Sequence, residues 1–421
     1  MTLYSIPYGL NSLSFDLPTN LKVDWIEPAY VPPNPDPLQV VQQSIIQPVD
    51  NRPLTTFGKI RSVALAVNDK TRPVPHEYLL PPLLEQLRAI GVSDDAVRIL
   101  IAMGTHLPMP ESEFSKILPG EIIDRYRINS HNCDDEENLV YLGETTRGTP
   151  ILVNHQFMEA DLRIVVGNIE PHHFAGFSGG AKTAAIGLTG RKTINHNHAL
   201  LVDPGARIAV YDQNPLRQDI EEIGDAINVQ FALNAILNGD KKIVQVVAGS
   251  PRQVMRAGIP ISQSYCQIPN KGGYDLVIAS VGGAPKDINF YQSQKALSHA
   301  SLFTRDGGVI VLAAACPEGS GSASFETFMV GLKTPQAVFE KFTREGFQVG
   351  PHKAFQVARD AARIHIILIS EIPGEKVQDL LMTPAPTIQD GILEALQRLA
   401  STRVADLKVA ILPRATNTIP V

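Results

Sequence analysis

The strongest constraint on the fold is a repeated alternation of short, β-branched apolar runs with turns and segments of helical periodicity. Such runs occupy residues 61–67 (RSVALAV), 97–103 and 162–167, and an amphipathic stretch over 78–90 separates the first two. Further runs follow at 276–280, 308–315, 364–370 and 409–412. Strands that alternate with helices predict an α/β fold with mainly parallel, doubly wound sheets.

The chain of 421 residues is long for one hydrophobic core, so two α/β domains are expected. The segment 268–273 (IPNKGG) is the predicted boundary, which gives an N-terminal domain over 1–270 and a C-terminal domain over 271–421. Residues 1–56 are rich in Pro, Asn and Asp and are expected to form an irregular arm. Two apolar runs around the sequence NGD, within 228–248, predict a β-hairpin.

The composition excludes several classes of protein. A net charge of −6 offers no basic surface for nucleic acid. The three cysteines, Cys133, Cys266 and Cys316, are far apart, so neither a disulfide framework nor a cysteine zinc site is expected, and a reducing cytoplasm is. No leader-like segment and no apolar run of about 18 residues is present, so neither export nor association with a membrane is expected.

Polar clusters directly follow several of the predicted strands. They are NDKTRP at 68–73, GTH at 104–106, EPHHFAGFSGGAKT at 170–183 and GGAPKDINFYQSQK at 282–295. In open α/β sheets ligands bind beyond the carboxyl ends of the strands. Because the clusters fall in both halves of the chain, the active site is predicted in the cleft between the two domains.

The stretch GFSGGAKT at 176–183 is similar to a phosphate loop. However, Ala181 replaces the glycine that precedes the lysine in that motif, and the preceding strand ends at Gly167, nine residues earlier. A phosphate- or nucleotide-binding transferase or hydrolase therefore stays open as an alternative. A glycine-rich turn with a solvated lysine is the simplest interpretation of the stretch on its own.

Basic and imidazole side chains cluster around this loop. They are His172, His173, Lys182, His196 and His198. Histidine is the commonest nitrogen ligand for metals such as nickel and zinc, and a natural general base near neutral pH. No HExxH motif accompanies them, and no carboxylate is spaced so as to complete a zinc site of three ligands, which disfavours a zinc hydrolase. In a helix His196 and His198 would point in different directions, so only one of them is expected to reach a given centre.

Two further pairs are candidate anion contacts. Asp69 is expected to orient Arg72, whose guanidinium can hold a carboxylate or a phosphate through two parallel hydrogen bonds. Gln292 and Lys295 are three residues apart and would share one face of a helix. A surface ion pair and a solvated helix face are the respective alternatives.

As an ordered set, these motifs resemble the lactate racemase family, whose enzymes use a nickel-pincer nucleotide. The set is NDKTRP, GTH, EPHHFAGFSGGAK, NHNH at 195–198 and GGAPKDINFYQSQKAL at 282–297. The resemblance implies a cytoplasmic, metal-binding isomerase that inverts C2 of a 2-hydroxy acid. It also implies reliance on separate enzymes that synthesise the cofactor, pyridinium-3,5-bisthiocarboxylic acid mononucleotide with nickel.

The resemblance also implies roles for individual residues. Lys182 would attach covalently to the cofactor, and His198 would be the protein's nickel ligand. His106 and His172 would act as general acid and base on either side of the substrate. Contacts to the cofactor and to the substrate anion would come from Asp69, Lys70, Thr71, Arg72, Gln292 and Lys295.

The expected chemistry removes C2 hydrogen as hydride, because a proton on this carbon is only weakly acidic. One histidine takes the hydroxyl proton, a flat 2-keto acid forms, and the second histidine returns a proton on the other side. Arg72 and Lys295 are the expected clamp on the carboxylate.

Departures from the family pattern bear on the substrate. Leu107 stands where a basic residue is expected in many members, and the only tryptophan is Trp25. The segment 350–355 (GPHKAF) brings two polar residues to the region expected to cover the substrate. These features favour a larger or more polar 2-hydroxy acid than lactate, such as a dicarboxylate or a sugar acid, as substrate of a racemase or an epimerase. A protein that binds the cofactor without turnover is the non-enzymatic alternative.

Overall fold

In a computed structural model, which describes residues 1–28, 30–268 and 273–420, the chain forms two compact units. One unit is Tyr30–Tyr265, and the other combines Met1–Ala29 with Cys266–Val421. The predicted domain of residues 1–270 is therefore wrong at its N-terminal end, because the first residues of the chain belong to the second unit. The predicted boundary segment 268–273 lies largely outside the described residues.

The unit Tyr30–Tyr265 is built on a six-stranded sheet of order β13-β12-β9-β4-β5-β6. Its strands are β4 (Val63–Asn68), β5 (Val97–Ala102), β6 (Arg127–Ser130), β9 (Leu162–Asn168), β12 (Phe231–Leu237) and β13 (Ile243–Gly249). All neighbouring pairs are parallel except β12 with β13. The sheet confirms the three strands predicted in this region, and the β12–β13 pair confirms the predicted hairpin.

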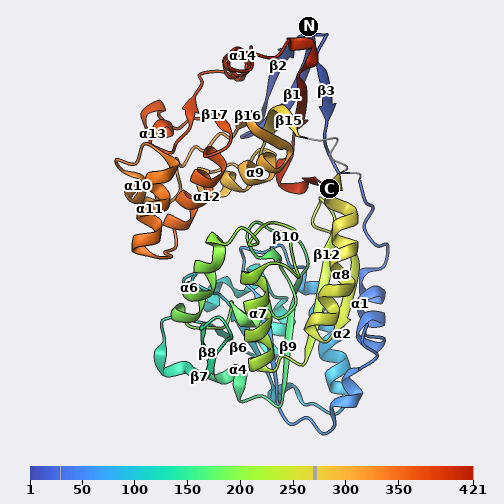
Figure 1. The fold of residues 1–421 in the computed structure, drawn as a ribbon. Coiled ribbons are helices and arrows are strands. Elements are labelled where there is room, and N and C mark those ends of the chain that lie inside the picture. The colour runs from blue at the N-terminus through green and yellow to red at the C-terminus, as the bar shows by residue number, and fades with distance from the viewer. Residues whose placement is uncertain (29, 269–272, 421) are drawn as a thin grey trace. The chain divides into compact units, whose positions relative to one another are not determined.

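Helices cover both faces of this sheet (Figure 1). They include α1 (Pro37–Ile46), α2 (His76–Ala89), α6 (Arg191–Ala199), α7 (Pro215–Ile227) and α8 (Pro251–Cys266). On one face, alternate residues of β4 such as Val63 and Leu65 share a core with Leu83 of α2. The intervening Ala64 and Ala66 are also buried. Burial on both faces explains why the strands are continuous apolar runs rather than alternating ones.

The second unit contains a six-stranded parallel sheet of order β18-β17-β16-β15-β19-β3. Its strands are β3 (Lys22–Trp25), β15 (Tyr274–Ser280), β16 (Thr304–Ala313), β17 (His365–Ile369), β18 (Thr383–Pro384) and β19 (Lys408–Leu412). Its helices are α9 (Phe290–Phe303), α10 (Ala323–Met329), α11 (Pro335–Glu345), α12 (Pro351–Ala361), α13 (Gly374–Asp379) and α14 (Ile388–Arg398). The four strands predicted in this half are confirmed.

The expected irregular arm over 1–56 is wrong. This segment contains α1 of the first unit, the edge strand β3, and an antiparallel hairpin of β1 (Thr2–Tyr8) and β2 (Asn11–Leu17). Ile6, Phe15 and Leu17 are buried in the core of the second unit. The hairpin has few apolar residues, but Ile6, Phe15 and Leu17 lie on the face that packs into the core, and the sheet supplies the rest of that core.

No helix within the described ranges is both long and apolar enough to span a membrane.

Candidate active site

Three of the predicted clusters meet at one edge of the first unit's sheet. The strands β9, β4 and β5 are adjacent and parallel, and their carboxyl ends lead into Glu170, Asp69 and Gly104. The chain runs from β4 first to β5 on one side and later to β9 on the other, so this is the point where the strand order reverses. Ligands bind at such points in open α/β sheets. Gly104 N–H also donates to the Gly187 carbonyl at 3.0 Å, which ties the loop after β5 to the segment after Lys182.

Asp69 is a buried carboxylate that organises the loop after β4. Its Oδ1 accepts hydrogen bonds from Thr71 N–H (3.2 Å) and from Thr71 Oγ1 (2.7 Å), and its Oδ2 lies 2.7 Å from His106 Nδ1. Burial works against its charge, but these hydrogen bonds and the charge of Arg72 outweigh burial, so the pKa of Asp69 is lowered. The expectation that Asp69 orients Arg72 through its side chain is wrong; it orients His106.

The contact with Asp69 fixes the proton position on His106. Since a carboxylate only accepts, Nδ1 of His106 carries the proton and the lone pair of the neutral ring lies on Nε2. The His106 side chain is 52% exposed. The neutral ring is therefore an accessible base held in one tautomer, as in catalytic Asp–His pairs.

His172 lies on a two-residue antiparallel ladder between β10 (Pro171–His172) and β11 (Gly176–Phe177). Its ring stacks on His173, with centroids 4.5 Å apart, and Ala175 N–H donates to its Nδ1 at 3.2 Å. Hence His172 has its Nδ1 as acceptor, whereas His106 has its Nδ1 as donor. The tight turn requires glycine at 176, where φ is +72° and a Cβ would lie 1.9 Å from the Val210 carbonyl oxygen.

Backbone N–H groups of the loop GFSGGAKT donate to the protein itself. Ser178 N–H donates to the Glu170 carbonyl (2.8 Å) and Gly180 N–H to Asn234 Oδ1 (2.7 Å). Lys182 then begins α5 (Lys182–Ala185), a helix of a single turn. A phosphate loop needs backbone N–H groups turned toward the ligand, so these contacts do not favour the phosphate-binding alternative.

The buried guanidinium of Arg217, on α7, supports the same loop from behind. It donates to the carbonyls of Phe177 (2.8 Å) and Gly179 (3.1 Å) and forms an ion pair with Glu221 at 2.6 Å. Both members of the ion pair are within 1% of full burial. The backbone that leads into Lys182 is therefore fixed by a charged side chain from another element.

Lys182 has an unusual ionisation. Burial, with the charges of Arg72 and Arg217, lowers its pKa to about 7, although Glu170 and Asp69 act in the opposite direction. A large fraction of the amine is thus neutral near pH 7, and a neutral amine is a nucleophile.

His198 lies on α6 with its ring centroid 5.1 Å from that of Phe174. Burial and the charge of Lys182 lower its pKa to about 3, so the imidazole is neutral and able to bind a metal near pH 7. His196 instead contacts Thr149 Oγ1 through its Nδ1 at 2.9 Å. The two histidines therefore point to different neighbours, as the helical spacing predicts.

The remaining predicted residues have contacts of their own. Lys70 is exposed and forms an ion pair with Glu113. Gln292 and Lys295 are on α9 of the other unit, where Lys295 Nζ donates to Gln292 Oε1 at 2.9 Å, so they share a helix face as predicted. The cleft between the domains stays a prediction.

Comparison with known proteins identifies the family. The family models for the lactate racemase N-terminal and C-terminal domains match residues 8–209 and 270–419. The lactate racemase of Thermoanaerobacterium thermosaccharolyticum is 31% identical over 424 residues, covering 98% of each chain. This chain belongs to the lactate racemase family.

Other relatives agree with this membership. The lactate racemase of Lactiplantibacillus plantarum is 28% identical over 382 residues, covering 89% of each chain. The structure of the lactate racemase apoprotein from T. thermosaccharolyticum matches all of both chains with a TM-score of 0.90 at 28% identity. A protein from Thermotoga maritima has the same fold, with a TM-score of 0.67 at 17% identity over 93% of this chain and 100% of its own. The family is one of racemases, so the chain is placed among the isomerases.

Within the lactate racemase fold, residues that support the site were missed from the sequence. Arg217, Asp219 and Glu221 are fully or almost fully buried on α7 among apolar positions such as Ile220 and Ile223. The sequence contains a pattern that predicts their burial, because these charged residues recur on the otherwise apolar face of an amphipathic helix. Asn234, which accepts from Gly180, lies inside the apolar run of β12. A polar side chain within a buried strand is the corresponding signal there.

Proposed function

We propose that this protein is a racemase or epimerase that inverts C2 of a 2-hydroxy acid with a nickel-pincer nucleotide attached to Lys182. The observation that carries the proposal is the pairing of a lysine whose pKa is lowered to about 7 with a neutral histidine, His198, beside it. Family membership supplies the reaction class.

The residues present fit such a cofactor. Within the described ranges, no three His, Cys, Asp or Glu side chains converge into a metal site. A metal held here would take most of its ligands from another molecule, with His198 as the protein's contribution. This also removes support from a zinc hydrolase. At the end of β9, the buried amide nitrogen of Asn168 has no hydrogen-bond partner among the residues that the structure describes, which is typical of a group that contacts a ligand.

Lys182 would hold the cofactor through an amide-type bond, which its neutral amine would form at the carbon of a thiocarboxyl arm with loss of water or hydrogen sulfide. When bound, the cofactor supplies a centre that accepts hydride from C2 and gives it back. Arg72, together with Gln292 and Lys295 of the other unit, is proposed to bind the carboxylate and the cofactor. Asp69 and Thr71 would shape the loop that presents Arg72, and Lys70 would add positive charge at its rim.

The two histidines would move the protons. His106 takes the hydroxyl proton at Nε2, and the charge of Asp69 stabilises the resulting imidazolium. His172 would return a proton on the other side from its Nε2. A neutral imidazole N–H is a very weak acid, so His172 must first be doubly protonated, which requires its Nδ1 to release the Ala175 N–H. The enzyme would thus finish one inversion in the protonation state from which the reverse inversion starts.

The proposed substrate is more polar than lactate. Trp25, on the edge strand β3, stacks on Tyr4 of β1, with ring centroids 6.4 Å apart. On α12, by contrast, Lys353 lies over the ring of Tyr291 at 4.9 Å and donates to Gln294 at 2.9 Å. Tyr291 and Gln294 lie one and two positions from Gln292 on α9, so the helix that carries a proposed substrate contact also carries these polar groups. The polar end of a dicarboxylate or a sugar acid fits that environment better than the methyl group of lactate does.

The test is to produce the protein together with cofactor-synthesis enzymes and to measure intact mass and nickel content. A nickel-bearing increment that is lost in Lys182→Ala supports the attachment. Racemisation in deuterated water then tests the chemistry, because hydride transfer keeps protium at C2 whereas proton abstraction introduces deuterium. No increment under conditions that load a known member of the family, or solvent deuterium at C2, would contradict the proposal.

A further inference from the structure

The imidazole of His198 is held by a side chain whose orientation is fixed. Its Nδ1 lies 3.0 Å from Asn197 Oδ1. The amide nitrogen of Asn197 donates to the Leu216 carbonyl at 3.0 Å and to Asp219 Oδ2 at 2.8 Å. Both of these oxygens only accept hydrogen bonds, so the amide cannot be flipped, and its oxygen must face His198.

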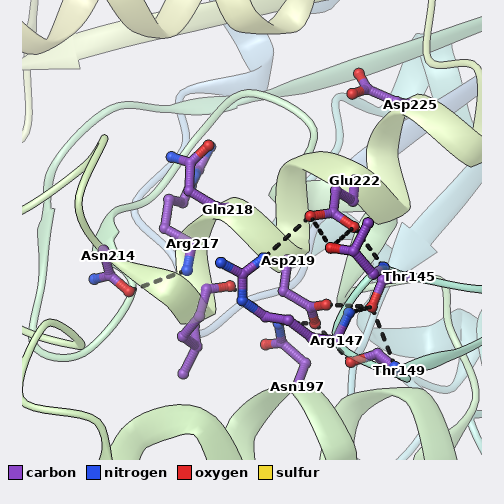
Figure 2. A network of polar contacts seen from close by, with 12 residues as sticks. Thr145, Arg147, Thr149, Asn197, Asn214, Arg217, Gln218, Asp219, Glu222 and Asp225 are labelled. Atoms are coloured by element: carbon purple, nitrogen blue, oxygen red, sulfur yellow. Dashed lines mark hydrogen bonds and ion pairs between the residues drawn. The ribbon is translucent and has the colours of Figure 1, made fainter.

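Asp219 anchors this arrangement from α7 (Figure 2). It is completely buried, and its Oδ1 accepts from Thr145 Oγ1 (2.5 Å) while its Oδ2 accepts from Thr149 Oγ1 (2.8 Å) as well as from Asn197. Three neutral donors thus surround a buried carboxylate.

The directions of these hydrogen bonds are also determined. Thr145 Oγ1 already accepts from the N–H groups of Arg147 (3.3 Å) and Thr149 (3.1 Å), so its own proton goes to Asp219. A carboxylate that only accepts stands at one end of the chain of contacts, and the ring of His198 stands at the other. Every proton position between them follows from what each atom can donate or accept.

We propose that Asn197 and Asp219 are positioning residues that hold His198 as the Nδ1–H tautomer, with its Nε2 lone pair directed to the metal. This inference rests on the proposed function for the identity of the metal. The Asn197 oxygen can only accept, so the proton lies on Nδ1 and the lone pair of the neutral ring lies on Nε2. Metal-binding histidines commonly donate their other N–H in this way, which fixes the ring and strengthens it as a ligand.

The negative charge of Asp219 adds to this effect. It polarises the Asn197 amide, so the amide oxygen becomes a better acceptor for the His198 N–H and the imidazole becomes a stronger electron donor. The same network also ties the turn at 145–149 to α6 and α7, and this purely architectural role would explain most of its contacts. The contact of Asn197 with His198 is the part that architecture does not require.

The first test needs no variant. Long-range ¹H–¹⁵N spectra of the cofactor-free protein, with ¹⁵N-labelled histidine and His198→Gln for assignment, report which ring nitrogen carries the proton. A proton on Nδ1 of His198 is the expected result. A proton on Nε2 would overturn the proposal, whether or not the protein is a racemase.

The second test compares Asn197→Leu and Asp219→Asn with Glu222→Gln in cofactor-loaded protein. Glu222 is on α7, like Asp219, and is also drawn in Figure 2, but it contacts Thr146 and Arg147 at the surface. Its change is therefore a matched loss of charge that leaves Asn197 in place. Loading is measured by intact mass, and nickel loss by transfer to a chelator over time.

About 10- to 100-fold weaker nickel retention is expected for Asn197→Leu, with a smaller loss for Asp219→Asn and none for Glu222→Gln. If Asn197→Leu does not fold, Asp219→Asn and the wild-type tautomer decide the matter. Wild-type retention in both variants at equal loading would overturn the proposal. A wild-type protein that takes up no cofactor at all would instead count against the proposed function, and the tautomer measurement would still judge the network.

Discussion

Asp69 Oδ2 lies 2.7 Å from Nδ1 of His106, on the loop that follows the neighbouring strand. The pair joins the ends of β4 and β5, and it makes the tautomer of His106 depend on a carboxylate that is itself buried. Replacing Asp69 by Asn tests this dependence, because an amide keeps the size but can present its NH₂ group to the ring. A fall in turnover of about 100-fold or more is expected, with a small change in KM.

Initial rates of the cofactor-loaded enzyme on a 2-hydroxy acid that the wild type converts provide the measurement. Thr71→Val is the matched control, since it removes a hydrogen bond to the same carboxylate without removing the charge. Equal losses in the two variants would mean that the loop's shape, rather than the Asp69–His106 pair, determines the rate.

The lowered pKa of Lys182 predicts that amine-selective reagents label it at a lower pH than an ordinary lysine. In the cofactor-free protein, labelling of Lys182 should reach half its maximum near pH 7, because its pKa is about 7. Arg72→Met should move that midpoint to higher pH, since Arg72 is the charge that contributes most to the shift. Peptide mass spectrometry over a pH series measures both. A midpoint near the ordinary lysine value of about 10.4 would refute the expectation.

Among the ion pairs that involve α7, a buried one and an exposed one should differ greatly in their effect on stability. Arg217→Met leaves Glu221 buried without its partner and should lower the free energy of unfolding by about 3–5 kcal/mol. Arg252→Met breaks a pair with Asp225 in which the side chains are 38% and 61% exposed, and should cost about 0–1 kcal/mol. Denaturant titrations of the two variants give the comparison. Similar losses would show that the buried pair is not specially stabilising.

Acid should destabilise the first unit through His76. Burial lowers the pKa of His76 from 6.5 to about 4, although the hydrogen bond from its Nδ1 to the Ile117 carbonyl acts in the opposite direction. Between these two pH values the unfolded chain binds a proton that the folded one does not, so stability falls as pH falls from about 6.5 to 4. The full effect of this one ring is about 3 kcal/mol.

His76→Gln should flatten the stability curve in that window, as followed by denaturant midpoints at several pH values. His155→Gln, at a ring whose side chain is 55% exposed, is the control. A slope that is unchanged by His76→Gln would place the acid sensitivity in other groups.

Sequence patterns were sufficient for the parallel sheets and for the residues that follow their strands. A buried parallel strand is a continuous apolar run. The polar residues after Asn68, Met103 and Gly167 directly follow such runs, so they lie at the carboxyl end of the sheet, where ligands bind. Arg217 and Asp219 were not found, because a charged residue on a helix reads as solvated until the loops at 145–149 and 177–179 are known to cover it. The N-terminal hairpin was missed because its core partners come from the far end of the sequence.

The N-terminal strands are synthesised long before the strands that complete their unit. The edge strand β3 pairs with β19, Val23 with Val409, so the second unit is split by the whole of the first. On a ribosome that adds roughly 5–20 residues per second, β3 must wait on the order of twenty seconds to a minute or more for its neighbour. The unit Tyr30–Tyr265 can fold in that interval, while β3 remains an unpaired strand open to the wrong partner. Chaperone dependence should therefore track the emergence of the last parallel strand.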